Sequence, residues 1–226
     1  MSQLTKRRLV QEGEAAPLFS LPAVSREGTI SLDDFRDSKA VLLGMLRGVY
    51  CPFCRRQMAQ LTKVADQLRP IGVETVLVIT TAPERARVYF QHYPTSLPIA
   101  SDPEMAAHRA YGVMRPELTD RPTNWPVTVN PNDLSEVHSD HSWPDVIEAT
   151  TLLEAVELLD AKDGYTRAEG DPEEQAKTWH QLSGLILIDK DGVVRWTNIE
   201  APGGLADFGN LASDTEIVAA AQRVAP

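Results

Sequence analysis

The only two cysteines of the chain, Cys51 and Cys54, are three residues apart. If a helix begins at this point, both side chains lie on one face of its first turn, and their Cα atoms fall within the roughly 4.4–6.8 Å that a disulfide spans. Free backbone N–H groups and the positive end of the helix dipole then favour the Cys51 thiolate, which is the attacking species. Pro52 suits the first helical position, where its missing N–H costs nothing. The spacing therefore predicts a redox dithiol in which Cys51 attacks and Cys54 resolves.

Basic and aromatic side chains flank the pair. Arg47 precedes it, and Arg55 and Arg56 follow it. We expect these charges to activate Cys51, and lowering its pKa by one unit corresponds to about 1.4 kcal/mol of differential stabilisation. For Arg47, a surface charge at the end of a strand is an equal alternative. Tyr50 is expected to shape substrate access or simply to pack in the core.

The alternatives to redox use are inert thiols or half of a zinc site. A zinc site needs four ligands, and no second Cys-x-x-Cys or His-x-x-x-His follows. His138 and His141 lie in a polar segment and are expected to be solvated. The sequence contains neither Gly-x-Gly-x-x-Gly after a strand nor a Gly-Lys-Ser/Thr loop. We therefore expect no metal and no cofactor, with electrons supplied by an external thiol reductant, either a thioredoxin-like protein or glutathione.

The segments around the cysteines alternate between strand and helix patterns. Residues 40–46 form a nearly continuous apolar run, typical of a strand buried on both faces. Helical spacing follows the cysteines and ends at Pro70, a second buried strand covers 73–80, and a second helix begins at Pro83. This order predicts a βαβ crossover and a parallel pair of strands, with the dithiol at the first strand-to-helix junction.

The remaining patterns predict an α/β fold with a central mixed sheet flanked by helices. The expected elements are an N-terminal hairpin within 13–30, a short helix after Ser31, an edge strand at 97–100, a helix at 103–111, a loop at 115–132, helices at 144–161 and from Asp171 to near His180, a hairpin at 185–196 with Asp191-Gly192 at its turn, and a closing helix at 214–224.

The net charge of −10 is unevenly distributed. Residues 119–181 contain 14 acidic and 4 basic side chains, and the remainder contains 18 of each sign. Such a surface repels nucleic acid. No stretch approaches the roughly 18 apolar residues of a membrane span, and no apolar run follows Lys6, Arg7 and Arg8 as it would in a secretory signal. We therefore expect a soluble, cytoplasmic protein.

Three segments resemble one known family. Gly13–Leu21 is similar to the entry pattern Gly-x-x-Ala-Pro-x-Phe-x-Leu, Arg47–Cys54 to Arg-Gly-x-(aromatic)-Cys-Pro-(aromatic)-Cys, and Leu185–Gly192 to Phe-Ile-Ile-Asp-x-x-Gly. All three resemble the redoxins, which include alkyl hydroperoxide reductase C and thiol-specific antioxidant proteins, and here their peroxiredoxin-like branch. The resemblance covers about residues 10–113 and 182–200. It implies a thioredoxin-like fold and antioxidant thiol chemistry.

The chain departs from this family at three positions. Peroxiredoxins carry Pro-x-x-x-Thr/Ser-x-x-Cys, whereas this chain has Gly44 and Gly48, so the hydroxyl expected to bind a peroxide oxygen is absent. Ser183 stands where the family has an arginine and thioredoxins have a cis-proline. Arg47 is a candidate to replace that arginine.

Residues 114–181 are expected to form an insertion within a single domain that spans 1–226. Its amphipathic helix needs an apolar surface to cover. The helix could cover its own domain, a second copy of the chain in a homodimer, or the site at Cys51, where the helix would be a lid. Packing within the domain is the simplest of these alternatives. Trp125, Trp143 and Trp179 would suit an aromatic-lined cleft.

Three functions follow from these features. The first is a thiol peroxidase in which Cys51 attacks a peroxide and Cys54 resolves the sulfenic acid as an intramolecular disulfide. The second is a thiol–disulfide oxidoreductase that acts on protein or small-molecule disulfides. The third is a non-enzymatic scaffold that binds a partner through the acidic insertion. The family resemblance slightly favours the first.

Overall fold

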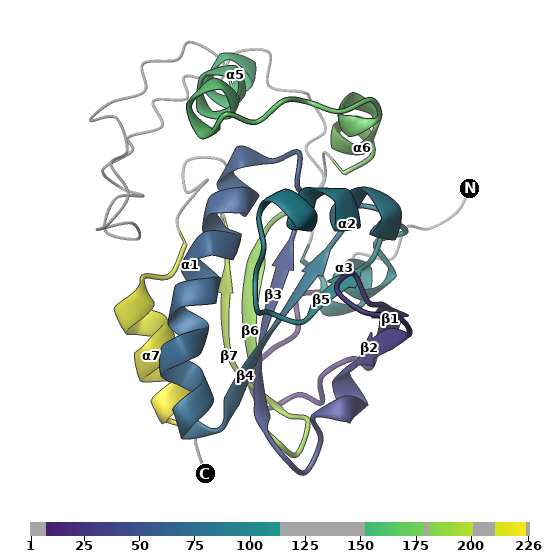
Figure 1. The fold of residues 1–226 in the computed structure, drawn as a ribbon. Coiled ribbons are helices and arrows are strands. Elements are labelled where there is room, and N and C mark those ends of the chain that lie inside the picture. The colour runs from purple at the N-terminus through teal and green to yellow at the C-terminus, as the bar shows by residue number, and fades with distance from the viewer. Residues whose placement is uncertain (1–7, 114–151, 179–180, 201–210, 225–226) are drawn as a thin grey trace.

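The computed structural model describes residues 8–113, 152–178, 181–200 and 211–224, with the side chains of 152–155 excluded (Figure 1). The loop expected at 115–132, the first part of the helix expected at 144–161, the histidines at 138 and 141 and the three tryptophans of the insertion lie outside these residues. Within the described residues, no helix is long and apolar enough to cross a membrane.

A five-stranded mixed sheet forms the centre of the molecule, with strand order β5-β4-β3-β6-β7. The central strand pairs in parallel with β4 and antiparallel with β6, and β5 and β7 form the edges. The strands are β3 (Ala40–Leu46), β4 (Val73–Ile79), β5 (Ile99–Ser101), β6 (Gly184–Ile188) and β7 (Val194–Ile199). The predicted parallel pair, edge strand and late hairpin are therefore confirmed.

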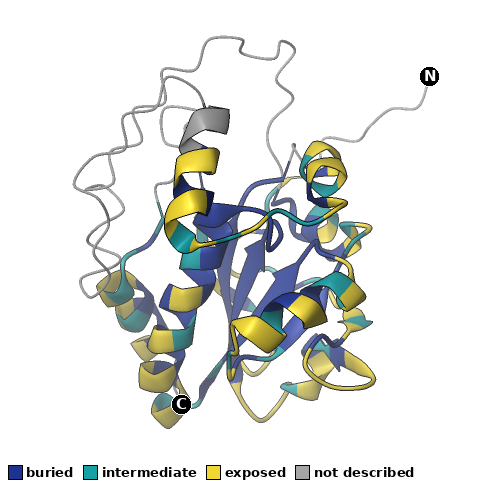
Figure 2. Cartoon of the chain, turned by 45° about the horizontal axis from the view of Figure 1, so that its top comes forward, coloured by how far each residue is buried: buried dark blue, intermediate teal, exposed yellow. Residues whose placement is uncertain are grey.

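Both faces of the sheet are covered, which explains the continuous apolar runs. All seven residues of β3 are buried; Leu42 faces the core beneath α1, and Leu43 faces the opposite core. The first core contains α1 (Pro52–Leu68), α2 (Pro83–His92) and α7 (Asp214–Gln222), and Figure 2 shows the exposed side of α1 turned away from the sheet. The second contains residues from α3 (Ala106–Tyr111) and from the N-terminal segment that carries β1 (Ser20–Pro22), β2 (Thr29–Ser31) and the 3₁₀ turn η1 (Leu32–Asp34).

α3 begins three residues later than the sequence predicts. Met105 adopts a left-handed conformation with φ of 54°, which excludes it from the helix. The Asp102 carboxylate accepts hydrogen bonds from the backbone N–H groups of Ala106 (2.8 Å) and His108 (3.1 Å). Asp102 therefore stabilises the first turn from outside it, and the helix starts at Ala106.

The part of the insertion that the structure describes contains α5 (Leu152–Asp163) and α6 (Asp171–Lys177). Both helices lie across the end of the sheet at which α1 begins (Figure 1). Val156 and Leu159 are buried in the core beneath α1, while Leu158 is exposed. The expectation that this helix packs on its own domain is confirmed for these residues.

Candidate redox centre

Cys51 is the N-cap residue of α1. Its backbone is extended, Pro52 is the first helical residue, and its Sγ accepts a hydrogen bond from the backbone N–H of Cys54 at 3.4 Å. The Cys51 N–H donates to the Gly48 carbonyl at 3.1 Å, which closes the turn before the helix. The predicted position of the dithiol at a helix N-terminus is confirmed, and both cysteines are free thiols.

The pKa values of the two thiols are shifted in opposite directions. Burial raises the pKa of Cys51, but hydrogen bonds from the Cys54 thiol and amide, together with the charge of Arg47, outweigh burial and lower this pKa to about 6. Burial raises the pKa of Cys54 well above its usual value, and the neighbouring Cys51 raises it further. At neutral pH the centre therefore contains a Cys51 thiolate beside a protonated Cys54.

Arg47 lies inside the protein, so the alternative of a surface charge was wrong. Its side chain is 7% exposed. The guanidinium donates to the Glu200 carboxylate at 2.9 and 3.2 Å and to the Gln181 carbonyl at 3.3 Å. Its charge is the one that favours the Cys51 thiolate.

Ser183 and Glu200 complete this side of the centre. The Ser183 Oγ lies 3.7 Å from the Cys54 Sγ, and the Ser183 N–H donates to Glu200 Oε2 at 3.1 Å. Glu200 could not be predicted from the sequence, because nothing in its neighbourhood distinguishes it from the other 31 acidic residues. Only the pairing of β3 with β6 and of β6 with β7 brings it beside Arg47.

Gly48 has no room for a side chain. A Cβ at this position would lie 2.3 Å from Glu174 Oε1 and 2.4 Å from Thr81 Oγ1. Thr81 donates to that Glu174 oxygen at 2.6 Å and accepts from the Val49 N–H at 3.0 Å. A carboxylate of α6 and the Thr81 hydroxyl therefore fill the space into which the hydroxyl residue of a peroxiredoxin would extend from position 48.

Gly44 is also required by packing. A Cβ at this position would lie 2.9 Å from Leu77 Cδ2 and 3.0 Å from Leu61 Cδ1. The glycine therefore allows α1 to approach the centre of β3 closely.

Arg55 is paired with carboxylates of the insertion. Its guanidinium donates to Asp160 at 2.8 Å and to Asp163 at 3.1 Å, and it lies 4.0 Å from the centre of the Tyr165 ring. The structure places this charge against two carboxylates of α5, which Arg56 and Arg167 also contact, and the cation that lowers the pKa of Cys51 is Arg47. Arg55 instead fastens α5 to the first turn of α1.

Tyr50 connects the cysteine segment to α6. Its buried hydroxyl is hydrogen bonded to the Thr178 hydroxyl, which in turn donates to the Glu174 carbonyl at 2.8 Å. Burial raises the pKa of Tyr50, so the phenol stays protonated and donates to Thr178. Tyr50 is thus packed in the core beneath the insertion and hydrogen bonded to Thr178.

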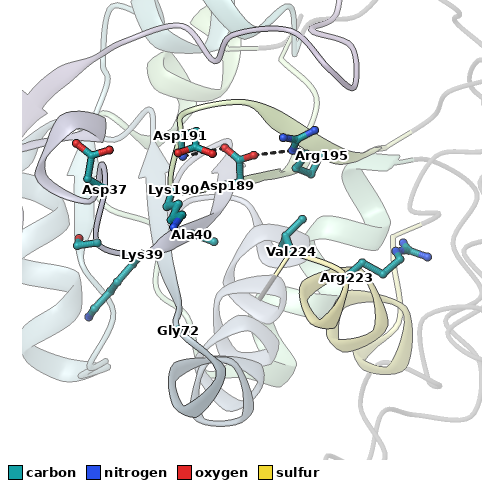
Figure 3. Close-up of a pocket in the computed structure, with 11 residues that line it drawn as sticks. Asp37, Lys39, Ala40, Gly72, Asp189, Lys190, Asp191, Arg195, Arg223 and Val224 are labelled. Atoms are coloured by element: carbon teal, nitrogen blue, oxygen red, sulfur yellow. Dashed lines mark hydrogen bonds and ion pairs between the residues drawn. The ribbon is translucent and has the colours of Figure 1, made fainter. Parts of the chain in front are cut away.

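Two hollows lie away from the sulfurs. The first, of about 440 Å³, is at the opposite end of β3 and is lined mainly by charged side chains, of which Asp189 and Arg195 pair at 2.6 Å (Figure 3). The second, of about 370 Å³, lies between α1 and α2 and is lined by Tyr89, Phe90, Tyr93 and Tyr165 among others. Neither cysteine lines either hollow. Among the described residues, no group of three or more Cys, His, Asp or Glu side chains is arranged to hold a metal ion.

The sequence also matches a family of known proteins. The model of the AhpC/TSA family matches residues 13–197, which is most of the chain. The chain belongs to the AhpC/TSA family. Membership confirms the redoxin resemblance and makes the protein a thiol-dependent oxidoreductase. This AhpC/TSA protein is 31% identical to the thiol-disulfide oxidoreductase ResA of Halalkalibacterium halodurans over 137 residues, which cover 60% of this chain and 71% of the relative.

Solved structures of the same architecture support the fold. A putative thiol:disulfide interchange protein DsbE from Chlorobium tepidum has a TM-score of 0.53 at 17% identity and covers 94% of this chain and 99% of its own. Peroxidoxin BcpB from Mycobacterium tuberculosis has a TM-score of 0.57 at 12% identity, with 94% and 97% covered. The predicted thioredoxin-like α/β fold is confirmed.

Proposed function

We propose that this protein is a thiol–disulfide oxidoreductase that reacts through Cys51 with protein or small-molecule disulfides. The observation that carries the proposal is the pairing of an acidic, helix-capping Cys51 with a buried, protonated Cys54 one turn later. This arrangement supplies a nucleophile at neutral pH and a second thiol within reach of a disulfide. The similarity to a relative named as a thiol-disulfide oxidoreductase supports the same function.

The exchange has two steps. The Cys51 thiolate attacks one sulfur of the substrate disulfide, the substrate S–S bond breaks, and one substrate thiolate leaves. Cys54 then loses its proton and attacks the Cys51 sulfur, so the second substrate thiolate leaves and takes up that proton. The substrate has gained two electrons, and the protein holds a Cys51–Cys54 disulfide. An external thiol reductant, such as glutathione or a thioredoxin-like protein, reverses these steps and restores both thiols.

Burial restricts which substrates reach the nucleophile. Cys51 is only 6% exposed, and the residues beside it are tied to α6 through Tyr50 and Thr178. A substrate disulfide therefore has to displace neighbouring side chains before its sulfur contacts Sγ. We expect extended or flexible disulfides to react faster than disulfides within rigid folded domains.

Reduction of peroxides is the second candidate, and the buried Arg47 favours it. A cation beside the thiolate stabilises the oxygen anion that leaves when Cys51 attacks a peroxide O–O bond. The products are an alcohol or water and a Cys51 sulfenic acid, which Cys54 converts to the disulfide with loss of water. The filled space at Gly48 weighs against this candidate, because the hydroxyl that lies there, that of Thr81, already donates to Glu174 and accepts from the Val49 N–H.

Parallel assays separate the two candidates. Reduced protein is mixed with glutathione disulfide, with a flexible disulfide-bonded peptide, with hydrogen peroxide and with cumene hydroperoxide, and its oxidation is followed by stopped-flow fluorescence. We expect disulfides to oxidise the protein faster than peroxides do. Peroxide rates that exceed disulfide rates by tenfold or more would reverse this assignment.

Cysteine variants test the assigned steps. We expect Cys51→Ser to abolish oxidation by every substrate, and Cys54→Ser to accumulate a mixed disulfide with the substrate on Cys51, detected by mass spectrometry. Full activity of Cys51→Ser would refute the proposal for both substrate classes.

A further inference from the structure

Glu200 is a buried carboxylate with fixed hydrogen-bond donors. It follows β7, and its side chain is 1% exposed. Oε2 accepts from Arg47 Nη1 at 2.9 Å and from the Ser183 N–H at 3.1 Å, while Oε1 accepts from Arg47 Nη2 at 3.2 Å. Its own N–H donates to the Ser183 carbonyl at 2.9 Å. A carboxylate bonded in this way has little freedom to move.

These bonds lead from Glu200 to both cysteines. On one side, Arg47 places its charge where it favours the Cys51 thiolate. On the other side, the Ser183 hydroxyl lies 3.7 Å from the Cys54 Sγ. One side chain that directly follows the edge strand β7 therefore fixes a neighbour of each sulfur.

We propose that Glu200 is a positioning residue that sets the acidity of Cys51, because it holds Arg47 in place and also opposes its charge. The inference rests on the proposed function only in assigning Cys51 as the nucleophile. It concerns a thiol titration that needs no substrate, so it can fail while the exchange activity stands, and the reverse also holds.

The two charges of the pair act on Cys51 with opposite signs. Arg47 lowers the pKa of Cys51, whereas Glu200 raises it. The two hydrogen bonds from Arg47 to Glu200 keep the guanidinium in its place near Cys51. The negative charge of Glu200 limits how far the guanidinium lowers the pKa of Cys51. Without the negative charge, the arginine would act on the thiol with its full strength.

The test compares three single variants. Glu200→Gln keeps the size of the side chain and one oxygen that accepts from Arg47 and Ser183, but removes the charge. Arg47→Met removes the cation. Glu74→Gln is the matched control, because Glu74 pairs with Lys39 at 2.7 Å at the start of the sheet, away from the sulfurs. The pH dependence of Cys51 alkylation by iodoacetamide is measured for each reduced protein, with the modified residue identified by mass spectrometry.

We expect the midpoint of Cys51 alkylation to move down in Glu200→Gln, up in Arg47→Met and not at all in Glu74→Gln. With a wild-type pKa of about 6, a decrease of one unit would raise the alkylation rate at pH 5 about fivefold. The disulfide of Glu200→Gln should also be reduced more readily by glutathione, because its thiolate product is more stable.

Two outcomes overturn the proposal: a Glu200→Gln midpoint equal to the wild-type value, or one that rises together with that of Arg47→Met. If Glu200→Gln fails to fold, Arg47→Met is compared with the double variant Arg47→Met/Glu200→Gln, which replaces the buried pair by neutral side chains. The double variant should have the lower midpoint of the two, and equal midpoints would again overturn the proposal.

Discussion

Two buried arginines flank the dithiol, and their surroundings differ. Arg47 precedes Cys51 and shares Glu200 with the amide of Ser183. Arg55 follows Cys54, faces two carboxylates of α5 and stacks on Tyr165. We call the first group, which consists of Arg47, Ser183 and Glu200, the redox network.

The second group is part of a larger set of contacts between the insertion and the rest of the domain. We call this set the α5–α6 seam. Its members are Tyr50, Arg55, Thr81, Asp160, Asp163, Glu174 and Thr178. Both groups are buried and charged, and the charges that shift the pKa of Cys51 include Arg47 and Glu200 of the first group. Glu200 matches Arg47 one to one, whereas Arg55 shares Asp160 with Arg167 and Asp163 with Arg56, so charge compensation does not distinguish the two arginines. They differ in the element that each joins to the cysteine segment, which is the end of β7 for Arg47 and α5 for Arg55.

The largest effect is expected for Arg55→Ala. Removing the guanidinium takes from Asp160 and from Asp163 one of the two arginines with which each pairs, so the free energy of unfolding should fall by about 3 kcal/mol. Urea denaturation measures this loss. Cys51 alkylation should keep its wild-type midpoint, and a rise as large as that of Arg47→Met would remove the distinction between the two arginines.

Gly48→Ala tests the closest contact of the seam. The new methyl group would overlap Glu174 and Thr81, and overpacking of this kind costs about 1–3 kcal/mol. Thermal unfolding checks the loss. The double variant Gly48→Ala/Glu174→Ala should recover part of it, and a double variant no more stable than Gly48→Ala would show that Glu174 is not the group displaced.

Tyr50→Phe removes a hydrogen bond between the cysteine segment and α6. The Thr178 hydroxyl would lose its donor, and we expect a decrease in stability of about 1 kcal/mol. A double-mutant cycle with Thr178→Val isolates this bond. A coupling energy of zero would mean that Tyr50 holds the seam by packing alone.

Glu174→Gln has the smallest expected effect, and its sign depends on pH. Burial raises the pKa of Glu174 above its usual value, although hydrogen bonds from Thr81 and Thr80 act in the opposite direction. A raised pKa in the folded state contributes stability at low pH, which is lost as the pH rises through that pKa. The variant should therefore match the wild type near pH 4 and be slightly more stable at pH 7. Urea denaturation at both pH values measures the difference, and a variant less stable at pH 7 would contradict it.

The sequence was informative wherever the signal was local. The apolar run at 40–46, the cysteine spacing and the Asp191-Gly192 turn each depend on neighbours in the chain, and the structure contains the elements that they predict. Gly192 has a φ of +80°, and Asp189 Oδ1 accepts the N–H groups of Asp191 and Val193. Such geometry is encoded in a few consecutive residues.

The charged environment of the sulfurs could not be predicted in this way. Arg47 and Glu200 are 153 residues apart, and Gly48 and Glu174 are brought together by the insertion. Whether an arginine faces a thiol or two carboxylates depends on which strands pair and where α5 packs. The single domain 1–226, the cytoplasmic location and the homodimer stay predictions.

The sulfur of Cys51 also caps α1, since it accepts the amide hydrogen of Cys54. Disulfide formation would replace an anionic acceptor by a neutral sulfur, which accepts weakly. The backbone N–H of Cys54 then makes a weaker hydrogen bond in the first turn of the helix. Deuterium uptake at the Cys54 amide should therefore be faster in the oxidised protein, so a single backbone position reports the redox state of the whole centre.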